Sequence, residues 1–558
     1  MRAARLTART WPTRRRRAPD PWPVAAGALA LLVSTPVLGV CAALLTPSRE
    51  VWRHLWATQL PELLGNTLAL IAGVGLGVGA LGTALAWLVT MYRFPGRRPL
   101  EWLLILPLAV PAYVMGFVFL AIFDYAGPVQ RAVRAVVGPR AWFPEPASYG
   151  GIVLVMTLVL YPYVYVLARA AFLEQSEATL EAARALGLSR RQAFWRVALP
   201  LARPSIAAGV TLALMEALAD FGTVAIFNYA TFTVAIYRVW FGLFDRQAAT
   251  ELASLLVLFT LVVYVLERRL RGGARFYQRG GGRGAAAVPL TRWRAAAATG
   301  AAGLVVGVAF GLPVLRLLAW VAIAGTYDPR YAQFLGATVL VAALTALLAV
   351  AAAVVVGYGV RLSRQHLVTG LARVAGMGYA LPGSVIAVGV LGLLAWVDAA
   401  LGAALHPLGV SPGLWLTGSL AGLVFAYLVR FLAVSSQTVE ASLARITPSM
   451  DMVARSLGRS PAGVLWRVHL PLLRRGLLAA ALLVFVDVIK EMPATLLLRP
   501  LGYETLAVRV WQFTSESLWE AAALPALTIV AAGILPVVVL VRESARPVAG
   551  VTSPAPRG

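Results

Sequence analysis

Long apolar runs alternate with short polar segments along the whole chain. A helix of about 20 residues crosses the roughly 30 Å hydrocarbon core of a bilayer, and twelve runs approach or exceed that length. The pattern therefore predicts an all-α polytopic membrane protein with about 12 transmembrane helices. The predicted spans are residues 24–45, 63–91, 102–123, 152–167, 206–227, 252–266, 296–323, 334–360, 374–396, 414–434, 477–498 and 521–541.

The composition agrees with a membrane protein and excludes several other classes. Of the 558 residues 60% are hydrophobic and 13% are charged, and the mean hydropathy is +0.78. Such a chain is too apolar for ordinary soluble domains or for a disordered protein. The single cysteine, Cys41, excludes a disulfide framework. Because the four histidines are scattered along the chain, we expect no stable metal site and no Cys/His nucleophile.

Membrane topology explains the net charge of +25. All basic residues except Lys490 are arginines, and most of them lie in short segments between apolar runs. Basic residues accumulate in the cytoplasmic loops of membrane proteins, and residues 14–17 are all arginine. We therefore expect both termini in the cytoplasm. The alternative for the arginine- and glycine-rich residues 268–294 is RNA binding, but topology already accounts for their charge, and we expect no nucleic-acid partner.

The two halves of the chain match each other at a constant shift of 271 residues. Matches at one fixed shift over most of each half indicate gene duplication. Six spans per half insert both halves in the same direction, which predicts two parallel six-helix repeats, residues 1–267 and 295–558, joined by a basic, Gly-rich cytoplasmic linker, residues 268–294. Around the fourth span we expect a change of register, with a few extra residues in the second half. Matching pairs are Pro111 and Pro382, Gly187 and Gly458, Pro200 and Pro471, and Trp240 and Trp511.

The loop between the fourth and fifth spans has the same pattern in both halves. Each predicts a helix, a glycine with positive φ, and a second short helix that a serine caps and a proline ends. We call each of these helix–glycine–helix segments an elbow. The glycines are Gly187 and Gly458, the serines Ser189 and Ser460, and the prolines Pro200 and Pro471.

Large apolar residues are expected at the tip of each elbow. They are Phe194 and Trp195 in the first half and Leu465 and Trp466 in the second. An ordinary helical hairpin between two spans is the alternative for one such loop taken alone. Two copies at the same shift, each presenting apolar side chains among arginines, favour docking into a groove of a partner.

The first elbow carries Glu181-Ala-Ala, then Gly187, and ends in Leu-Pro200. This pattern resembles the EAA loop of ABC importer permeases, which in that family forms the coupling helix seated in the ATPase subunit. A fused pair of six-span halves is a known arrangement there. The second elbow departs from the pattern, because Met452 replaces the glutamate and Asp451 stands one position early. The resemblance implies the ATPase-coupling residues Glu181, Ala182, Ala183, Gly187, Phe194, Trp195, Ala454, Gly458, Leu465 and Trp466.

The chain has no motif for nucleotide binding. A P-loop contains Gly-Lys followed by Ser or Thr, and the only lysine, Lys490, is followed by Glu491. No nucleophile, base and orienting group recur together at the aqueous ends of the spans, so we predict a transport subunit without enzymatic activity or a cofactor of its own. The resemblance implies two ATP-binding subunits at the elbows, which bind ATP and Mg, and a periplasmic solute-binding protein.

Each predicted fifth span contains two acidic residues four positions apart, which places them on one helix face. Glu216 and Asp220 in the first half match Asp487 and Glu491 in the second. Carboxylates inside a span usually face a cavity or a partner. We therefore interpret them as lining the translocation path, where they transiently bind a hard cation such as ferric iron. The alternative is structural, with Lys490 paired to Asp487 or Glu491.

Two segments point to a cargo by resemblance. Residues 487–500, followed by 505–511, resemble the corresponding part of fused iron(III) transport permeases, and residues 219–223 with 237–242 are similar to their first half. This implies uptake of ferric iron by alternating access across a bacterial inner membrane. One alternative is an ABC permease for thiamine or another small solute. The other, a secondary transporter driven by an ion gradient, has no use for paired elbows.

Overall fold

The computed structural model describes residues 21–45, 47, 49–175, 183, 185–271, 287–324, 328–363, 365–408 and 413–544. Within these ranges the regular elements are helices, apart from two-residue strands β1 (Tyr92–Arg93) and β2 (Val288–Pro289), which pair in parallel. Eleven of the described helices are long and apolar enough to cross a membrane. The predicted all-α polytopic fold is confirmed.

The helices of the first half are α1 (Pro21–Ala42), α2 (Arg49–Thr58), α3 (Leu60–Met91), α4 (Arg97–Leu103), α5 (Ala112–Phe123), α6 (Pro128–Val137), α7 (Tyr149–Glu174), α9 (Arg190–Ala193), α10 (Leu199–Ala219), α11 (Gly222–Ile226), α12 (Phe232–Gly242) and α13 (Arg246–Arg271). Single helical turns of a different pitch are η1 (Ala43–Leu45), η2 (Leu106–Ala109) and η3 (Phe194–Ala198).

The helices of the second half are α14 (Arg292–Val306), α15 (Leu312–Ala324), α16 (Tyr331–Leu362), α17 (His366–Ala375), α18 (Gly383–Leu405), α19 (Leu420–Leu443), α20 (Pro448–Ser456), α21 (Pro461–Val464), α22 (Leu470–Ile489), α23 (Pro493–Leu498), α24 (Leu506–Ser515) and α25 (Trp519–Ser544). Its additional turns are η4 (Gly307–Gly311), η5 (Gly378–Ala380), η6 (His406–Leu408) and η7 (Leu465–His469).

The one predicted span outside these eleven, residues 477–498, falls largely on α22. Its 20 residues reach across a bilayer at about 1.5 Å per residue. It contains three charged residues, Arg474, Arg475 and Asp487. Together with the eleven helices above, α22 accounts for the expected number of about twelve.

Helix boundaries repeat at the same shift as the sequence. Helices α3 and α16 begin and end 271 residues apart, and so do α9 and α21. Helices α7 and α19 also begin at that shift, at Tyr149 and Leu420. The expected change of register around the fourth span is therefore wrong. The halves differ there in their side chains and not in the length of the chain.

The first helix of each half packs against the other half. Helix α1 lies against α16, α17 and α18, whereas α14 contacts α4 and α15 contacts α5. The approach is close, since a Cβ atom at Gly359 would meet Ala26, and one at Gly389 would meet the carbonyl oxygen of Pro36. Small residues at such contacts let membrane helices pack through their backbones. This exchange binds the two halves into one bundle.

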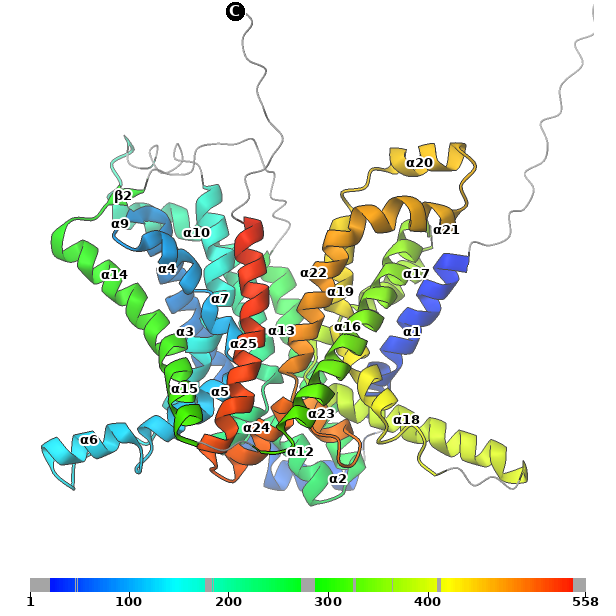
Figure 1. Ribbon diagram of the computed structural model, residues 1–558, viewed down its shortest axis with the longest axis horizontal. Coiled ribbons are helices and arrows are strands. Elements are labelled where there is room, and N and C mark those ends of the chain that lie inside the picture. The colour runs from blue at the N-terminus through cyan, green and yellow to red at the C-terminus, as the bar shows by residue number, and fades with distance from the viewer. Residues whose placement is uncertain are drawn as a thin grey trace, which may run out of the picture.

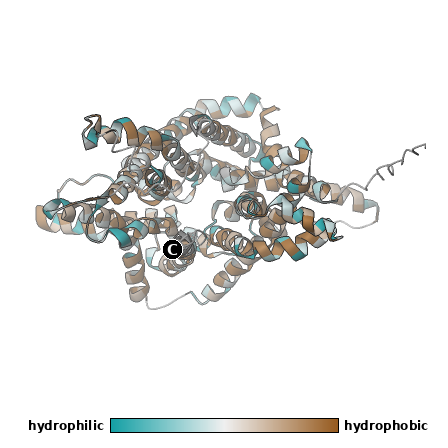
Figure 2. Ribbon diagram, turned by 90° about the horizontal axis from the view of Figure 1, so that it is seen from above, coloured by the Kyte–Doolittle hydropathy of each residue, from teal (hydrophilic) through white to brown (hydrophobic). Residues whose placement is uncertain are grey.

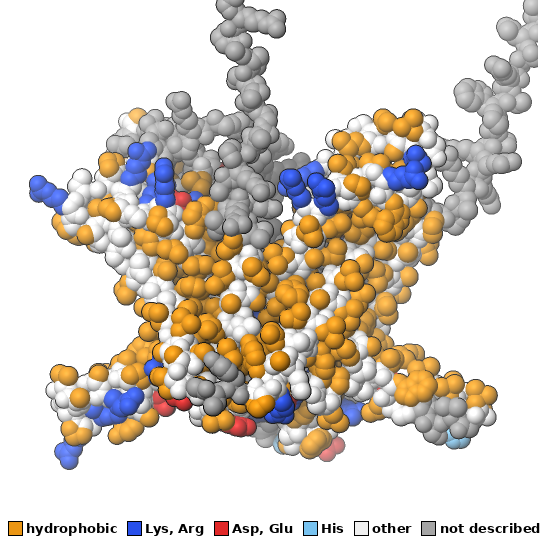
Figure 3. Space-filling model, viewed as in Figure 1, with side chains coloured by type: hydrophobic (Ala, Val, Ile, Leu, Met, Phe, Trp, Pro, Cys, Tyr) orange, Lys and Arg blue, Asp and Glu red, His pale blue; other side chains and the backbone are white. Residues whose placement is uncertain are grey.

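The bundle has two distinct ends. Figure 1 shows α9, α20 and α21 at one end, and α6 and the end of α18 projecting sideways near the other. Seen along the bundle, many helices appear end-on and apolar residues predominate (Figure 2). Figure 3 shows hydrophobic side chains around the middle and charged side chains gathered near the two ends, as expected for a membrane protein.

Two predicted spans begin later than expected. Prolines 111 and 382 precede α5 and α18, which start at Ala112 and Gly383, and the residues before them form the turns η2 and η5. Proline fixes φ and lacks an N–H, so it suits the start of a helix and not its interior. The span predicted at 374–396 is therefore shifted toward the C-terminus, and the helix predicted at 102–123 starts about ten residues later but ends as predicted.

Candidate functional site

Both fifth spans are interrupted near the middle of the bundle. Helix α10 ends at Ala219 and α11 begins at Gly222, while α22 ends at Ile489 and α23 begins at Pro493. The sequence analysis predicted one unbroken helix in each place, and that prediction is wrong. Non-helical backbone at this depth is tolerated only where protein groups or a cavity satisfy its polar atoms.

One acidic residue of each pair forms hydrogen bonds with the backbone at the break. The Asp220 carboxylate accepts hydrogen bonds from the backbone N–H groups of Thr223 (2.9 Å) and Val224 (3.2 Å). At the position shifted by 271 residues, Glu491 accepts one from the N–H of Ala494 at 3.0 Å. Both side chains therefore cap the short helix after the break. They do not share a helix face with Glu216 and Asp487 as expected, because the helices end before them.

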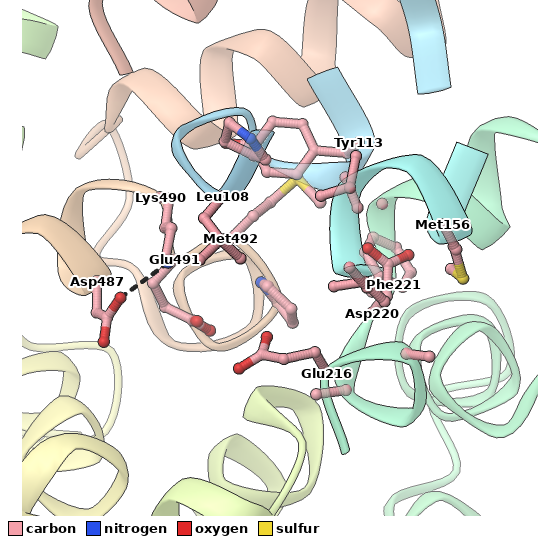
Figure 4. Close-up of a pocket in the computed structure, with 18 of the residues that line it drawn as sticks. Leu108, Tyr113, Met156, Glu216, Asp220, Phe221, Asp487, Lys490, Glu491 and Met492 are labelled. Carbon is pink, nitrogen blue, oxygen red and sulfur yellow. Dashed lines mark ion pairs between the residues drawn. The ribbon is translucent and has the colours of Figure 1, made fainter. Parts of the chain in front are cut away.

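All four predicted acidic residues nevertheless line one cavity of about 110 Å³ between the two halves. Figure 4 shows Glu216 and Asp220 on one side of it and Asp487 and Glu491 on the other. Further side chains in the lining are Tyr113, Met156, Tyr163, Tyr379, Arg430 and Lys490. The structure thus brings together the residues that the repeat predicted to converge.

The two remaining acidic residues have different partners. The hydroxyl of Tyr379, in η5 of the second half, donates a hydrogen bond to Glu216 at 3.0 Å. Asp487 forms an ion pair with Lys490 at 2.8 Å. The structural alternative from the sequence is thus correct for the Lys490–Asp487 pair. In the part of the chain that the structure describes, Glu216 forms no ion pair.

A second ion pair belongs to the second half alone. Arg430 contacts Glu491 at 2.6 Å, and the two residues are only 8% and 5% exposed. A Cβ atom at Gly383 would collide with both side chains, so glycine makes room for the pair. The first half has Val159 and Ala112 at the matching positions. The sequence signal for this pair was an arginine inside a predicted span, Arg430, where the first half has Val159.

The charge in the cavity is therefore unevenly distributed. Four carboxylates and two cations line it, which leaves a formal charge of two negative. Both cations, Arg430 and Lys490, come from the second half, where each is paired to a carboxylate. The first half has Ala219 at the position of Lys490. The excess negative charge therefore lies on the first-half side.

The elbows lie at one end of the bundle, and the glycine break is formed as predicted. Gly187 and Gly458 have φ of 84° and 79°. The backbone N–H of Leu188 donates to Ala183 at 3.2 Å, and the same bond joins Arg459 to Ala454 at 3.2 Å. These bonds close a left-handed helix end that glycine adopts without strain. Glu181 and Ala182 lie outside the described residues.

The helix after each break begins as predicted but ends elsewhere. The hydroxyls of Ser189 and Ser460 accept hydrogen bonds from backbone N–H groups three residues on, at 3.3 Å and 3.2 Å. Pro200 and Pro471 do not end the helix, and this prediction is wrong. The wide turns η3 and η7 precede them, and their five-residue hydrogen bonding shifts the backbone ladder so that the helix continues through the proline.

Only the tryptophans form an exposed tip. Trp195 is 59% and Trp466 68% exposed. Phe194 instead packs on Trp87, with ring centroids 4.7 Å apart, and Leu465 is buried. The predicted apolar tips are thus correct for the tryptophans and wrong for Phe194 and Leu465. Neighbouring residues on a helix point in different directions, so one side chain faces outward and the next faces the bundle. Around the second tip Met452, Val453 and Leu457 are also exposed, whereas Ala183 and Ala454 are buried.

The second elbow has an additional attachment. Asp451 pairs with Arg361 of α16 at 2.9 Å and with His469 of η7 at 2.6 Å. The Asp451 carboxylate is therefore engaged within the fold. The first half has Thr90 and Ala198 where Arg361 and His469 stand. The attachment is specific to the second half.

The chain is similar to membrane components of several transport systems. The family described as "Binding-protein-dependent transport system inner membrane component" matches residues 79–274, which include the first elbow, Glu216 and Asp220. The Fe(3+)-transport system permease protein FbpB 2 of Haemophilus influenzae is 28% identical over 493 residues, 87% of this chain and 90% of that protein. The Sulfate transport system permease protein CysT of Salmonella typhimurium is 30% identical over 252 residues, 42% of this chain and 88% of that protein.

Proposed function

We propose, from the premise that this chain belongs to the family of binding-protein-dependent transport system inner membrane components, that it conducts ferric iron across the inner membrane. The predicted ABC importer permease is thereby confirmed as a class of protein, and its relatives are transport permeases. The ferric cargo is the proposal. It has support from the Fe(3+)-transport relative, which aligns with both halves of the chain.

The charge of the central cavity carries the proposal. Four carboxylates and two already paired cations leave a surplus of negative charge around Glu216. Carboxylate oxygens are the ligands that hard cations prefer. A sulfate ion, the cargo named for the CysT relative, would be repelled there, since both cations are paired to carboxylates. The site therefore favours a multivalent cation over an oxyanion.

The contact between Tyr379 and Glu216 suggests how the site opens. Tyr379 belongs to the second half and Glu216 to the first, and both line the cavity, so their hydrogen bond joins the two halves there. In the proposed cycle the halves reorient about this cavity, the bond breaks, and the Glu216 carboxylate becomes available to the cargo. When the halves close again, Tyr379 competes with the cation for the same oxygen and promotes its release.

Energy enters through partner subunits in this proposal. Two ATP-binding subunits, which bind ATP and Mg, dock on the two elbows, with Trp195 and Trp466 as the exposed anchors. The coupling set is Glu181, Ala182, Ala183, Gly187, Phe194, Trp195, Ala454, Gly458, Leu465 and Trp466, in which the buried members shape the elbow and the exposed ones contact the partner.

The proposed orientation follows from the elbows. The elbows face the cytoplasm, and so do both termini. The linker, residues 268–294, joins the halves 1–267 and 295–558 on the same side. A periplasmic solute-binding protein docks at the opposite end of the bundle. This arrangement places α6 and the far end of α18 at the outer surface of the membrane.

Transport in reconstituted vesicles tests the cargo. The chain is combined with its ATP-binding subunits and binding protein, and radiolabelled ferric iron or sulfate is presented to the outer side. We expect ATP-dependent accumulation of iron and none of sulfate. Accumulation of sulfate at the rate of iron would overturn the cargo. Uptake by the chain alone under an ion gradient would overturn ATP-driven transport.

A further inference from the structure

A second charged pocket lies at the end of the bundle opposite the elbows. It has a volume of about 430 Å³ and lies between the start of α6, the middle of α15 and the start of α25. Four charged residues line it, Asp124, Arg131, Arg316 and Glu520. Figure 3 shows basic and acidic side chains close together at this end. Neither the translocation path nor the elbows use this pocket.

Asp124, Arg131 and Glu520 are exposed at the mouth of the pocket, and Arg316 is half-buried. Among the described residues none of them forms an ion pair or a side-chain hydrogen bond, although two carboxylates and two guanidinium groups share one pocket. The Nε atom of Arg316 is buried without a hydrogen-bond partner. A buried donor without an acceptor is costly and marks a place where a further group is missing. The pocket thus offers two anion-binding groups and two cation-binding groups at once.

Arg316 is held in place by an aromatic floor. Its guanidinium carbon lies 4.5 Å from the centroid of the Trp320 ring. Phe117 stacks between Trp320 and Trp519, with centroid separations of 6.2 Å and 6.1 Å. Both tryptophans also line the pocket. A cation over an indole face is electrostatically stabilised, and three stacked rings make a rigid support.

The position of the pocket matches the boundary between lipid and water. Arg316 lies within the span Arg292–Ala324, near its far end, and Trp519 begins the last span. Long arginine side chains reach from within a span to the headgroup level, where tryptophans also accumulate. On α15, Leu315 and Leu318 next to Arg316 are 67% and 47% exposed, which is typical of a lipid-facing surface.

The first turn of helix α6 lines one side of the pocket, through Pro128 and Arg131. Its arginines and its valines fall on opposite faces, and Val136 and Val137 are 87% and 71% exposed. The helix projects sideways from the end of the bundle (Figure 1). A short amphipathic helix in this position lies in the plane of the membrane interface with its apolar face toward the acyl chains. Arg131 on its polar face lines the pocket.

We propose that this pocket binds the headgroup of a zwitterionic phospholipid that carries a phosphate and a primary ammonium group. Arg131 and Arg316 bind the phosphate, and Asp124 and Glu520 accept hydrogen bonds from the ammonium. Equal numbers of positive and negative groups match a phosphoethanolamine headgroup better than an anionic one. The acyl chains lie along the exposed leucines of α15. In the orientation given above, this headgroup belongs to the outer leaflet. The proposed lipid site does not depend on which cargo is transported.

Lipid titrations of the purified full-length chain test this proposal. Native mass spectrometry follows the binding of phosphatidylethanolamine, phosphatidylcholine and phosphatidylglycerol with identical acyl chains. We expect phosphatidylethanolamine to bind about tenfold more tightly than the other two, because only it offers both charges and three N–H donors. Equal binding of phosphatidylglycerol would overturn the ammonium half of the site. Equal binding of phosphatidylcholine would overturn the need for N–H donors. Both readouts use the unmodified protein.

Paired substitutions locate the binding. Arg316→Gln with Glu520→Gln should abolish the preference, whereas Arg140→Gln with Glu145→Gln, which removes the same charges from exposed positions after α6, should leave it unchanged. A preference that survives the first pair would overturn this location. Inorganic phosphate and free phosphoethanolamine serve as competitors. We expect neither to displace the lipid at millimolar concentration, and full displacement by inorganic phosphate would show a soluble-anion site instead.

Discussion

The two halves share one backbone plan but differ in charge at the same positions. In the second half both acidic residues of the fifth span are neutralised, by Arg430 and Lys490, and Gly383 makes room for one of the pairs. In the first half Val159 and Ala219 stand in place of these cations, and Glu216 accepts a hydrogen bond from the hydroxyl of Tyr379. Duplication thus supplied a symmetric framework, and the differences in charge leave the second-half side of the cavity neutralised and the first-half side with uncompensated negative charge.

The largest effect is expected from the buried ion pair. Arg430→Met leaves the Glu491 carboxylate without its cation at a site only 5% exposed, which costs about 3–5 kcal/mol of stability. The folded yield and the thermal unfolding midpoint in detergent should both fall. Adding Glu491→Gln to that variant should restore part of the loss. If Arg430→Met leaves stability unchanged, the Arg430–Glu491 pair does not stabilise the second-half side of the cavity.

The elbows are expected to give the next largest effect. Trp195→Asp together with Trp466→Asp removes both exposed anchors, and losing an interface tryptophan costs about 2 kcal/mol or more. Binding of ATP-binding subunits should weaken at least about thirtyfold, and uptake should stop while the chain remains folded. Trp142→Asp, which replaces an 84% exposed tryptophan outside the elbows, is the control. Unchanged subunit binding would remove the elbows as docking sites.

Substitutions of the cavity carboxylates Glu216 and Asp487 are expected to have smaller effects, and the effects on ferric uptake should differ between the two. Glu216→Gln removes a charge that no cation balances and should lower ferric uptake about tenfold. Asp487→Asn should have a weaker effect, since Lys490 already neutralises Asp487. Assembly with ATP-binding subunits should be unchanged in both variants, and Glu62→Gln, at an exposed position, is the control. Equal losses in the two variants would contradict the asymmetry between the halves.

The smallest effect concerns pH and a loop of the second half. The backbone N–H of Arg330, aided by the charges of Arg330 and Arg509, holds the pKa of Asp328 below its ordinary value. A carboxylate with a lowered pKa stabilises the fold above its ordinary pKa and loses that contribution as the pH falls below about 4. Arg238, the first-half residue that matches Arg509, donates a hydrogen bond to the side-chain oxygen of Asn228.

The thermal unfolding midpoint measured between pH 7 and pH 3 tests this difference. Asp328→Asn should lower the midpoint slightly at pH 7 and flatten its decline in acid. Arg238→Gln should leave the acid decline as in the unmodified chain, because that arginine pairs with an amide that does not titrate in this range. A steeper decline in the Asp328 variant would contradict the assigned sign.

Sequence alone predicted the parts of the molecule that depend on local chemistry. Apolar length gave the spans, and the glycine–serine spacing gave the elbow breaks at Gly187 and Gly458, because positive φ and helix capping are properties of a few neighbouring residues. The convergence of Glu216 and Asp487 also followed from the repeat. Whether these residues act in transport stays a prediction.

The sequence analysis missed one local feature and several that depend on distant neighbours. The breaks after Ala219 and Ile489 had a local signal, because Gly222 and Pro493 begin the helices that follow them. Asp220 and Glu491, just before those helices, supply the capping bonds. Phe194 was expected at the surface, but Trp87 on another helix covers it. Burial and ion pairing arise from contacts between segments far apart in the chain, which hydropathy patterns do not encode.

The exchange of first helices has a consequence for biosynthesis. Helix α1 leaves the ribosome first, yet its neighbours α16, α17 and α18 are made some three hundred residues later. Contacts between such distant segments form late because a long loop must close before they are gained. During synthesis α1 must therefore stay in the bilayer in contact with lipids or insertion factors until these helices are made. Cleavage of the linker after assembly would leave two fragments that remain associated through their exchanged helices.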